Sequence, residues 1–244
     1  MVAARSGLPH AAAMGLGPRG TPFTPYGPWS TVGLAAAILY GSALLSWMLM
    51  TSVGAAPSGA AAGEATLAYA IIANLIGIAA VAKLTDLRAP GQSPAYLALR
   101  PFTGDDGWRW LGIAAAFFAV DAFAETVLRD ALGIAAPSTW LDDLQPGLLY
   151  VMAIVITGPI FEEMLARGFV MEGLMRTRLG VSGALVLSTL AWTLLHSEYD
   201  VLSLMLVFLT GLIFGAARLA TGSLLLSIAL HMAWNAMSVL LWHI

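Results

Sequence analysis

The chain has 244 residues, of which 59% are hydrophobic and only 10% are charged, and its formal net charge is -3. A slightly acidic balance argues against a nucleic-acid partner, because proteins that bind nucleic acid usually carry a basic stripe. The chain has no cysteine, which excludes disulfides, thiolate nucleophiles and cysteine-based metal sites. Its 25 glycines fit a membrane protein, since small residues let transmembrane helices approach closely.

The apolar residues run in blocks of roughly 20, the length that crosses about 30 Å of hydrocarbon. Residues 1–29 precede these blocks, are rich in glycine and proline, and are predicted to form a flexible cytoplasmic tail. The blocks lie near 31–54, 65–82, 110–128, 147–178, 181–197, 201–217 and 223–243. We therefore predict an all-α fold for residues 30–244, a polytopic transmembrane helical bundle of about seven to eight spans. The eighth span would arise if the long fourth block breaks at Gly158-Pro159.

The basic residues orient these spans. With the N-terminus inside, the cytoplasmic side receives Arg5, Arg19, Lys83, Arg88, Arg100, Arg109, Arg176, Arg178 and Arg218. Arg129 falls outside, in company with Asp130, Asp142 and Asp143. This bias follows the positive-inside rule and predicts a cytoplasmic N-terminus. Because the alanine- and glycine-rich composition is typical of a GC-rich bacterial genome, the predicted location is the bacterial cytoplasmic (inner) membrane.

Residues 161–167 read FEEMLAR and place three charges inside the fourth block. Charged side chains within a span are costly to bury and are functional more often than those in soluble cores. Glu163 and Arg167 are i,i+4 neighbours and are predicted to form an ion pair. Glu162 is turned about 100° away from Glu163 and lacks that partner, which makes it the candidate general base. A structural ion cluster that ties helices together is the alternative interpretation.

Two histidines also fall within spans, and each has an i,i+4 partner on its own face. Trp192 precedes His196 in WTLLH and is predicted to wall a pocket and exclude water. Asn235 follows His231 in HMAWN and is predicted to hold that ring or to donate to an oxyanion. Counting from the cytoplasmic helix ends puts Glu162 and His196 at roughly 24 Å. The same count puts His231 at roughly 14 Å and Asn235 at roughly 20 Å, so the polar groups fall in overlapping slices of membrane.

Three motifs thus occur in order on the late spans: EExxxR at 162–167, WxxxH at 192–196 and HxxxN at 231–235. Together they resemble the CPBP intramembrane proteases, a family that includes the CAAX prenyl endopeptidases of the Rce1 type and the Abi proteins. The resemblance covers about residues 83–241, the protease-like core. The second motif usually opens with Phe, and Trp192 stands in its place here, which changes the pocket volume and bears on substrate preference.

The resemblance implies an endopeptidase that works within the membrane on a membrane-embedded or lipidated protein. By this resemblance Glu162 would activate a water and His196 would help to orient it. His231 and Asn235 would stabilise the tetrahedral oxyanion, while Glu163 and Arg167 would shape the site. The residues themselves allow this chemistry, because no Ser/His/Asp set is evident and the Glu–His pair is the convergent base.

The sequence leaves open whether the site binds a metal. Glu162, His196 and His231 could form a zinc set of carboxylate and imidazole ligands. However, the sequence has no HExxH pattern, and the two histidines lie on separate blocks. The expectation is a metal-free site, with zinc as the alternative.

Two further functions remain open from the sequence. The same fold could serve as a non-catalytic membrane scaffold or a toxin-immunity protein, in which the motifs act as packing groups. It could also be a proton-coupled transporter with Asp121, Glu125 and Glu162 as a relay, although the broken helices expected of one are not evident. Asp121 and Glu125 are otherwise predicted to be helix-packing groups, and Asn74 to make an interhelical hydrogen bond. The sequence names neither the substrate nor the oligomeric state.

Overall fold

The structure is a computed structural model that describes residues 26–52, 62–135, 144 and 147–242. Residues 1–25 of the predicted tail lie outside the described residues, as do Asp142 and Asp143 of the predicted outer loop. All regular elements of the described residues are helices, which confirms the predicted all-α class.

Six helical stretches of the described chain are long and apolar enough to cross a membrane. They are α2 (Pro28–Ser52), Gly63–Arg88 within α3 (Ala62–Arg88), Gly104–Leu132, Leu148–Met175, α11 (Val201–Thr221) and Leu224–Leu241 within α12 (Leu224–Trp242). Gly104–Leu132 comprises α5 (Gly104–Phe123), a π-helical stretch (Ala124–Leu128) and α6 (Arg129–Leu132), and the short α4 (Ser93–Tyr96) precedes it. The chain is therefore an integral membrane protein, as predicted.

The fifth predicted span is a shorter apolar helix, Gly180–His196. It consists of α10 (Gly180–Thr193) and a closing 3₁₀ turn (Leu194–His196), which leads into the loop before α11. With this helix the described bundle has the predicted seven apolar helices, although this one is shorter than the usual membrane crossing.

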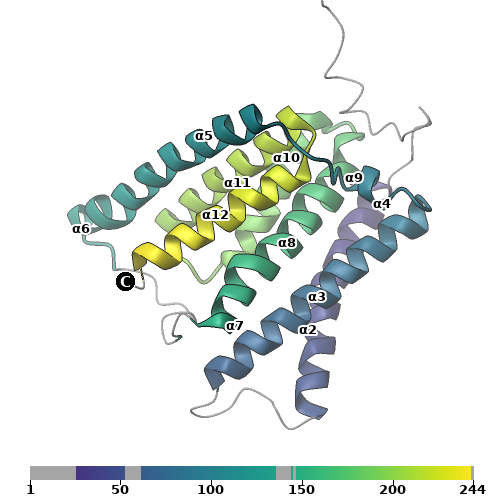
Figure 1. The fold of residues 1–244 in the computed structure, drawn as a ribbon, viewed down its shortest axis with the longest axis horizontal. Coiled ribbons are helices and arrows are strands. Elements are labelled where there is room, and N and C mark those ends of the chain that lie inside the picture. The colour runs from purple at the N-terminus through teal and green to yellow at the C-terminus, as the bar shows by residue number, and fades with distance from the viewer. Residues whose placement is uncertain (1–25, 53–61, 136–143, 145–146, 243–244) are drawn as a thin grey trace, which may run out of the picture.

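The long fourth helix, Leu148–Met175, occupies the middle of the bundle. It is the most buried of the candidate spans. Of its most apolar stretch, 56% of the residues are buried inside the protein, compared with 17–44% for the other five spans. Its parts are α7 (Leu148–Tyr150), a π stretch (Val151–Thr157), α8 (Gly158–Glu163), a second π stretch (Met164–Val170) and α9 (Met171–Met175). Figure 1 shows α8 lying between α12 on one side and α3 on the other. Its side chains can therefore meet partners from several helices.

The break predicted at Gly158-Pro159 is wrong, because the chain stays helical from Leu148 to Met175 and yields no eighth span. A proline has no N–H and its ring clashes with the carbonyl four residues back. The preceding π stretch removes that conflict, since the N–H of Gly158 bonds to the carbonyl of Ala153, five residues back. Pro159 then falls in the first turn of α8, where a missing N–H costs least.

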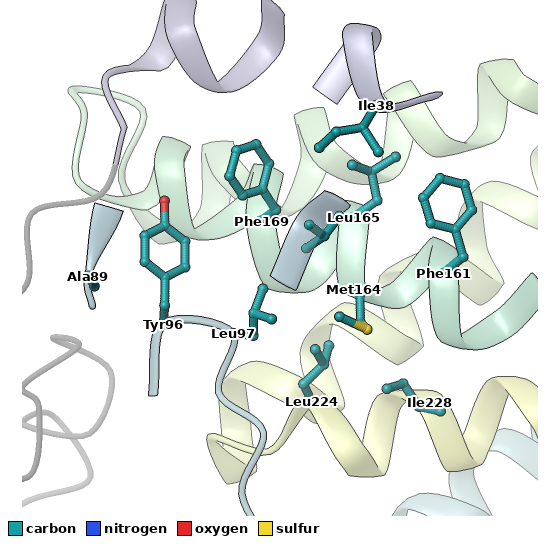
Figure 2. Close-up of a cluster of buried hydrophobic side chains, with 11 residues drawn as sticks. Ile38, Ala89, Tyr96, Leu97, Phe161, Met164, Leu165, Phe169, Leu224 and Ile228 are labelled. Carbon is teal, nitrogen blue, oxygen red and sulfur yellow. The ribbon is translucent and has the colours of Figure 1, made fainter. Parts of the chain in front are cut away.

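A cluster of buried apolar side chains fixes the fourth helix against its neighbours, and Figure 2 shows their arrangement. Its members are Ile38, Val81, Ala89, Tyr96, Leu97, Phe161, Met164, Leu165, Phe169, Leu224 and Ile228. The helix α3 approaches closely here, because a Cβ on Gly77 would overlap the ring of Phe161. Phe161 and Met164 flank the two adjacent glutamates, so this packing holds both carboxylates in place.

Candidate active site

Glu163 and Arg167 form the ion pair that their spacing predicts. Arg167 Nη1 lies 2.9 Å from Glu163 Oε1, and both side chains are fully buried. Arg167 Nη2 also donates to the carbonyl of Gly211 on α11 at 3.0 Å. A buried charge needs a partner of opposite sign and further hydrogen bonds, and this pair has both.

Glu163 accepts two further hydrogen bonds from α12, so it joins that helix to α8. Ser227 Oγ donates to Glu163 Oε2 at 2.6 Å, and His231 Nδ1 lies 3.1 Å from Glu163 Oε1. Because Glu163 is paired with Arg167 and accepts, Nδ1 of His231 carries the proton in this contact. The ring of His231 also stacks on Phe214, with centroids 5.0 Å apart.

Glu162 has a different environment from the carboxylate next to it. Its side chain is 29% exposed, whereas that of Glu163 is 0% exposed. Glu162 Oε2 lies 4.0 Å from Nε2 of His231, the ring nitrogen that Glu163 leaves free. That separation is too long for a direct hydrogen bond but short enough for one water to bridge. The sequence prediction that Glu162 lacks an arginine partner therefore agrees with the geometry.

Trp192 contacts four other residues of the candidate site, in addition to its predicted role as a pocket wall. Its Nε1 donates to Glu162 Oε2 at 2.6 Å, and the guanidinium carbon of Arg167 lies 4.5 Å from its ring. Its ring also meets those of His196 and His231 edge to face, at centroid distances of 5.0 and 5.6 Å. The hydrogen bond to Glu162 was missed from the sequence. The available signal was the replacement of Phe by Trp, which adds an N–H donor to the aromatic ring.

His196 lies at the end of the 3₁₀ turn and is partly exposed. Its Nδ1 is 3.2 Å from the carbonyl of Trp192, and its ring lies 5.6 Å from that of Tyr199. Among the described residues it makes no hydrogen bond or ion pair with either site glutamate. The structure thus brings His196 beside Trp192, as predicted, and connects it to Glu162 only through that ring.

Asn235 forms a hydrogen bond with a backbone carbonyl of the fourth helix. Its Nδ2 donates to the carbonyl of Ile154 at 2.8 Å. That carbonyl has no helical donor, because the N–H of Gly158 bonds to Ala153 and Pro159 has none. The predicted hold of Asn235 on the ring of His231 is therefore wrong, since Glu163 orients that ring. The second N–H of Asn235 remains for other partners.

The three donors proposed as a zinc set do not gather into one cluster. Within the part of the chain that the structure describes, no group of three or more His, Cys, Asp or Glu side chains is arranged to hold a metal ion. His231 directs Nδ1 at Glu163, and the nearest polar contact of His196 is a backbone carbonyl. As they stand, these residues do not fit a three-ligand zinc site.

A second ion cluster joins the end of the third span to the start of α11. Arg129 pairs with Glu125 Oε2 at 2.6 Å and Asp200 Oδ2 at 2.8 Å, and it donates to Ser203 Oγ at 2.7 Å. Burial alone would raise the pKa of Asp200. The hydrogen bonds from Arg129 and from two backbone N–H groups outweigh burial and hold that pKa below its usual range. Glu125 thus links the third span to α11 through Arg129 and Ser203, and Arg129 balances its charge.

A third cluster lies around Glu172 on α9. Arg218 of α11 lies 3.0 Å from Glu172 Oε2, and both side chains are nearly fully buried. Arg176 lies 3.3 Å from Glu172 Oε1 and is 30% exposed. The cluster ties α9 to α11.

The fold and the Glu163 cluster together define a helical integral membrane protein with a glutamate–histidine–arginine centre between its spans. Residues 144–237 match the family model described as type II CAAX prenyl endopeptidase Rce1-like. All three sequence motifs lie inside the matched stretch, and the predicted resemblance is confirmed. Over this segment the chain is similar to the Rce1-like family, whose description is that of an endopeptidase.

A curated protein of Escherichia coli, described as an uncharacterized 24.3 kDa protein, is 38% identical over 97 residues. The aligned stretch is 38% of this chain and 44% of that protein, so the chain spans less than half the length of this relative. No solved structure matches the chain.

Proposed function

We propose that the protein is an intramembrane endopeptidase that hydrolyses a peptide bond of a membrane-embedded or lipidated protein. Glu162 activates the attacking water in this proposal. The observation that carries it is the contrast between two adjacent carboxylates. Glu163 is sealed in a buried ion pair, whereas Glu162 is accessible and faces Nε2 of His231.

The chemistry follows from this contrast. A water bound beside Glu162 transfers a proton to its carboxylate as the water oxygen attacks the substrate carbonyl carbon. The carbonyl oxygen gains negative charge in the tetrahedral intermediate. When the C–N bond breaks, the proton on Glu162 passes to the departing amine. This second proton transfer returns the carboxylate to its starting state.

The buried residues support Glu162 without taking a proton from the water. Glu163 accepts from Nδ1 of His231 and so holds the ring with Nε2 toward Glu162. This is the arrangement by which a carboxylate fixes the tautomer and direction of a catalytic imidazole. Arg167 keeps Glu163 charged, and therefore keeps it an acceptor. His196 is proposed to orient the substrate or the water from the more exposed side, and His231 with Asn235 to bind the oxyanion.

The proposal includes no metal, because the described donors do not form a three-ligand set. Purified, active protein should therefore keep its turnover after treatment with a chelator. Stoichiometric zinc in active protein, together with loss of activity on chelation, would overturn this part of the proposal. The proposed membrane is the bacterial inner membrane with the N-terminus in the cytoplasm. The lipid bilayer is the proposed surrounding partner, with no nucleic acid involved.

The test compares the membrane proteomes of cells that carry the wild-type protein or Glu162→Gln at matched expression. The change keeps the shape of the side chain and removes the basic carboxylate. The expected result is that specific membrane or lipidated proteins accumulate uncleaved with the variant. A matched control is Glu198→Gln, which changes an exposed glutamate just beyond His196 and should leave processing intact. Identical proteomes for wild type and Glu162→Gln, with a phenotype on full deletion, would instead favour a scaffold or immunity protein.

A further inference from the structure

Gly158 presents a face of the fourth helix that is bordered by polar atoms. The three heavy atoms nearest to a Cβ built on it are the carbonyl oxygen of Ala153 at 2.8 Å, Glu162 Oε1 at 3.7 Å and Asn74 Nδ2 at 3.8 Å. Among the described glycines, the others with close neighbours meet at least one carbon atom. Gly158 itself is buried, and Ala153 belongs to the same helix and accepts the N–H of Gly158. The side-chain atoms that border this face are therefore those of Glu162 and Asn74.

Glu162 directs its available oxygen to this face. Oε2 accepts the hydrogen bond from Trp192 and faces His231. Oε1 is the oxygen near Gly158. The carboxylate oxygen that borders Gly158 is thus the one that the surrounding side chains leave unoccupied.

Asn74 borders the same face from α3 and is held in a fixed position. Its Nδ2 donates to Thr157 Oγ1 at 3.2 Å, and Thr157 Oγ1 in turn donates to the carbonyl of Met152 at 2.8 Å. One turn further along α3, Gly77 packs directly on Phe161. An amide nitrogen carries two N–H groups, and Thr157 uses one of them. Among the described residues the second N–H of Asn74 has no partner.

We propose that Asn74 is a catalytic residue of this chain that donates to the substrate carbonyl oxygen as it becomes an oxyanion. In this arrangement Glu162 Oε1 and its water lie on one side of the substrate carbonyl and Asn74 on the other. Asn74 lies outside the segment 144–237 that matches the family, so the family match does not assign it. The interhelical hydrogen bond predicted for Asn74 is present, and it positions the amide for this second task. The inference rests on the proposed function.

The test measures turnover by purified full-length protein in proteoliposomes, with the membrane protein that accumulates in Glu162→Gln cells as substrate. Asn74→Leu keeps the side-chain size and removes the donor. Removal of one oxyanion donor lowers kcat by about 10²–10³-fold, and KM should change little. Asn74→Asp is a second variant, which keeps the shape of the side chain but has no N–H to donate to Thr157 or to the substrate, and it should lose kcat as well.

Ser46→Ala is the matched control, because it removes a different hydrogen bond to α3, the one that Ser46 Oγ donates to the carbonyl of Tyr69 at 2.8 Å. The expected result is near-normal kcat for Ser46→Ala and melting temperatures that agree between it and Asn74→Leu. Wild-type kcat for Asn74→Leu would overturn the inference while leaving the proposed function intact. Equal losses of kcat and melting temperature in Asn74→Leu and Ser46→Ala would assign Asn74 a packing role and would also overturn it. If Glu162→Gln cells accumulate no substrate, the proposed function fails, and this inference fails with it.

Discussion

Arg167→Met tests whether the ion pair at the centre of the bundle is buried as the structure places it. Methionine has a similar length and no charge, so the change removes the partner of Glu163 without opening a large cavity. Two unit charges about 4 Å apart attract by roughly 4 kcal/mol at an effective dielectric constant of 20. Because both side chains are fully buried, loss of the guanidinium leaves the carboxylate with only Ser227 and His231 as partners. The expected decrease in the free energy of unfolding is about 3–5 kcal/mol, the usual cost of breaking a buried pair.

The decisive measurement is a double-mutant cycle. Unfolding free energies would be measured by denaturant titration in mixed micelles for wild type, Arg167→Met, Glu163→Gln and the double variant. The double variant leaves no uncompensated charge and should be less destabilised than the sum of the single changes by more than about 1 kcal/mol. Additive effects, or a loss under about 1 kcal/mol for Arg167→Met alone, would refute the reasoning, since exposed pairs behave in that way.

Three further predictions concern the hydrogen bond from Trp192 and the other two ion clusters. Trp192→Phe keeps the ring but removes the donor to Glu162 and should lower kcat by roughly 10–100-fold, because hydrogen bonds to charged groups contribute about 1.5–3 kcal/mol; unchanged turnover beside a Trp108→Phe control would contradict a role for the N–H. Glu172→Gln leaves a buried arginine unpaired and should cost about 3–5 kcal/mol in unfolding free energy, whereas Arg176→Gln at the half-exposed end should cost about 1 kcal/mol or less; equal costs would contradict the assigned burial. The lowered pKa of Asp200 means that its carboxylate stabilises the fold above the unfolded value of about 4 and loses this effect as the pH falls through the folded value. Asp200→Asn should therefore lower the melting temperature at pH 7, and the difference from the wild type should shrink as the pH falls below about 4. A difference independent of pH would contradict this.

Relations within one helix were predictable from the sequence. The pairing of Glu163 with Arg167 follows from a rotation of about 100° per residue, and so does the separation of Glu162 from that pair. The i,i+4 contact of Trp192 with His196 has the same origin, and the structure contains it. These relations need only the chain to be helical, which the long apolar blocks already indicate.

Relations between helices were not predictable in the same way. The hydrogen bond from Trp192 to Glu162, and the contact of His231 with Glu163, depend on how two helices are rotated about their axes. A rotation by one residue position would exchange which glutamate faces each partner. The assignment of Asn235 to His231 was wrong for this reason, because the i,i+4 spacing says which side chains share a face and not what that face meets.

The course of the fourth helix shows a second limit. The sequence marks Gly158-Pro159 as a place where an α-helix loses a hydrogen bond, but it does not say how the loss is accommodated. The structure accommodates it with a π stretch, a bond from Gly158 to Ala153, and the amide of Asn235 on the carbonyl of Ile154. The last of these comes from a different helix, and only packing brings it there.

The sequence by itself determined that the protein is a helical membrane protein, that its late spans resemble the Rce1-like family, and that Glu162 stands apart from the ion pair beside it. These properties depend on composition, block length and helical period, which are local. Only the tertiary structure decided that Glu163 orients His231, that Trp192 holds one oxygen of Glu162, and that Asn74 lies across Gly158 from the other. Each of these depends on the packing of side chains between helices, where close approach at glycines and the exclusion of unpaired charge select one arrangement.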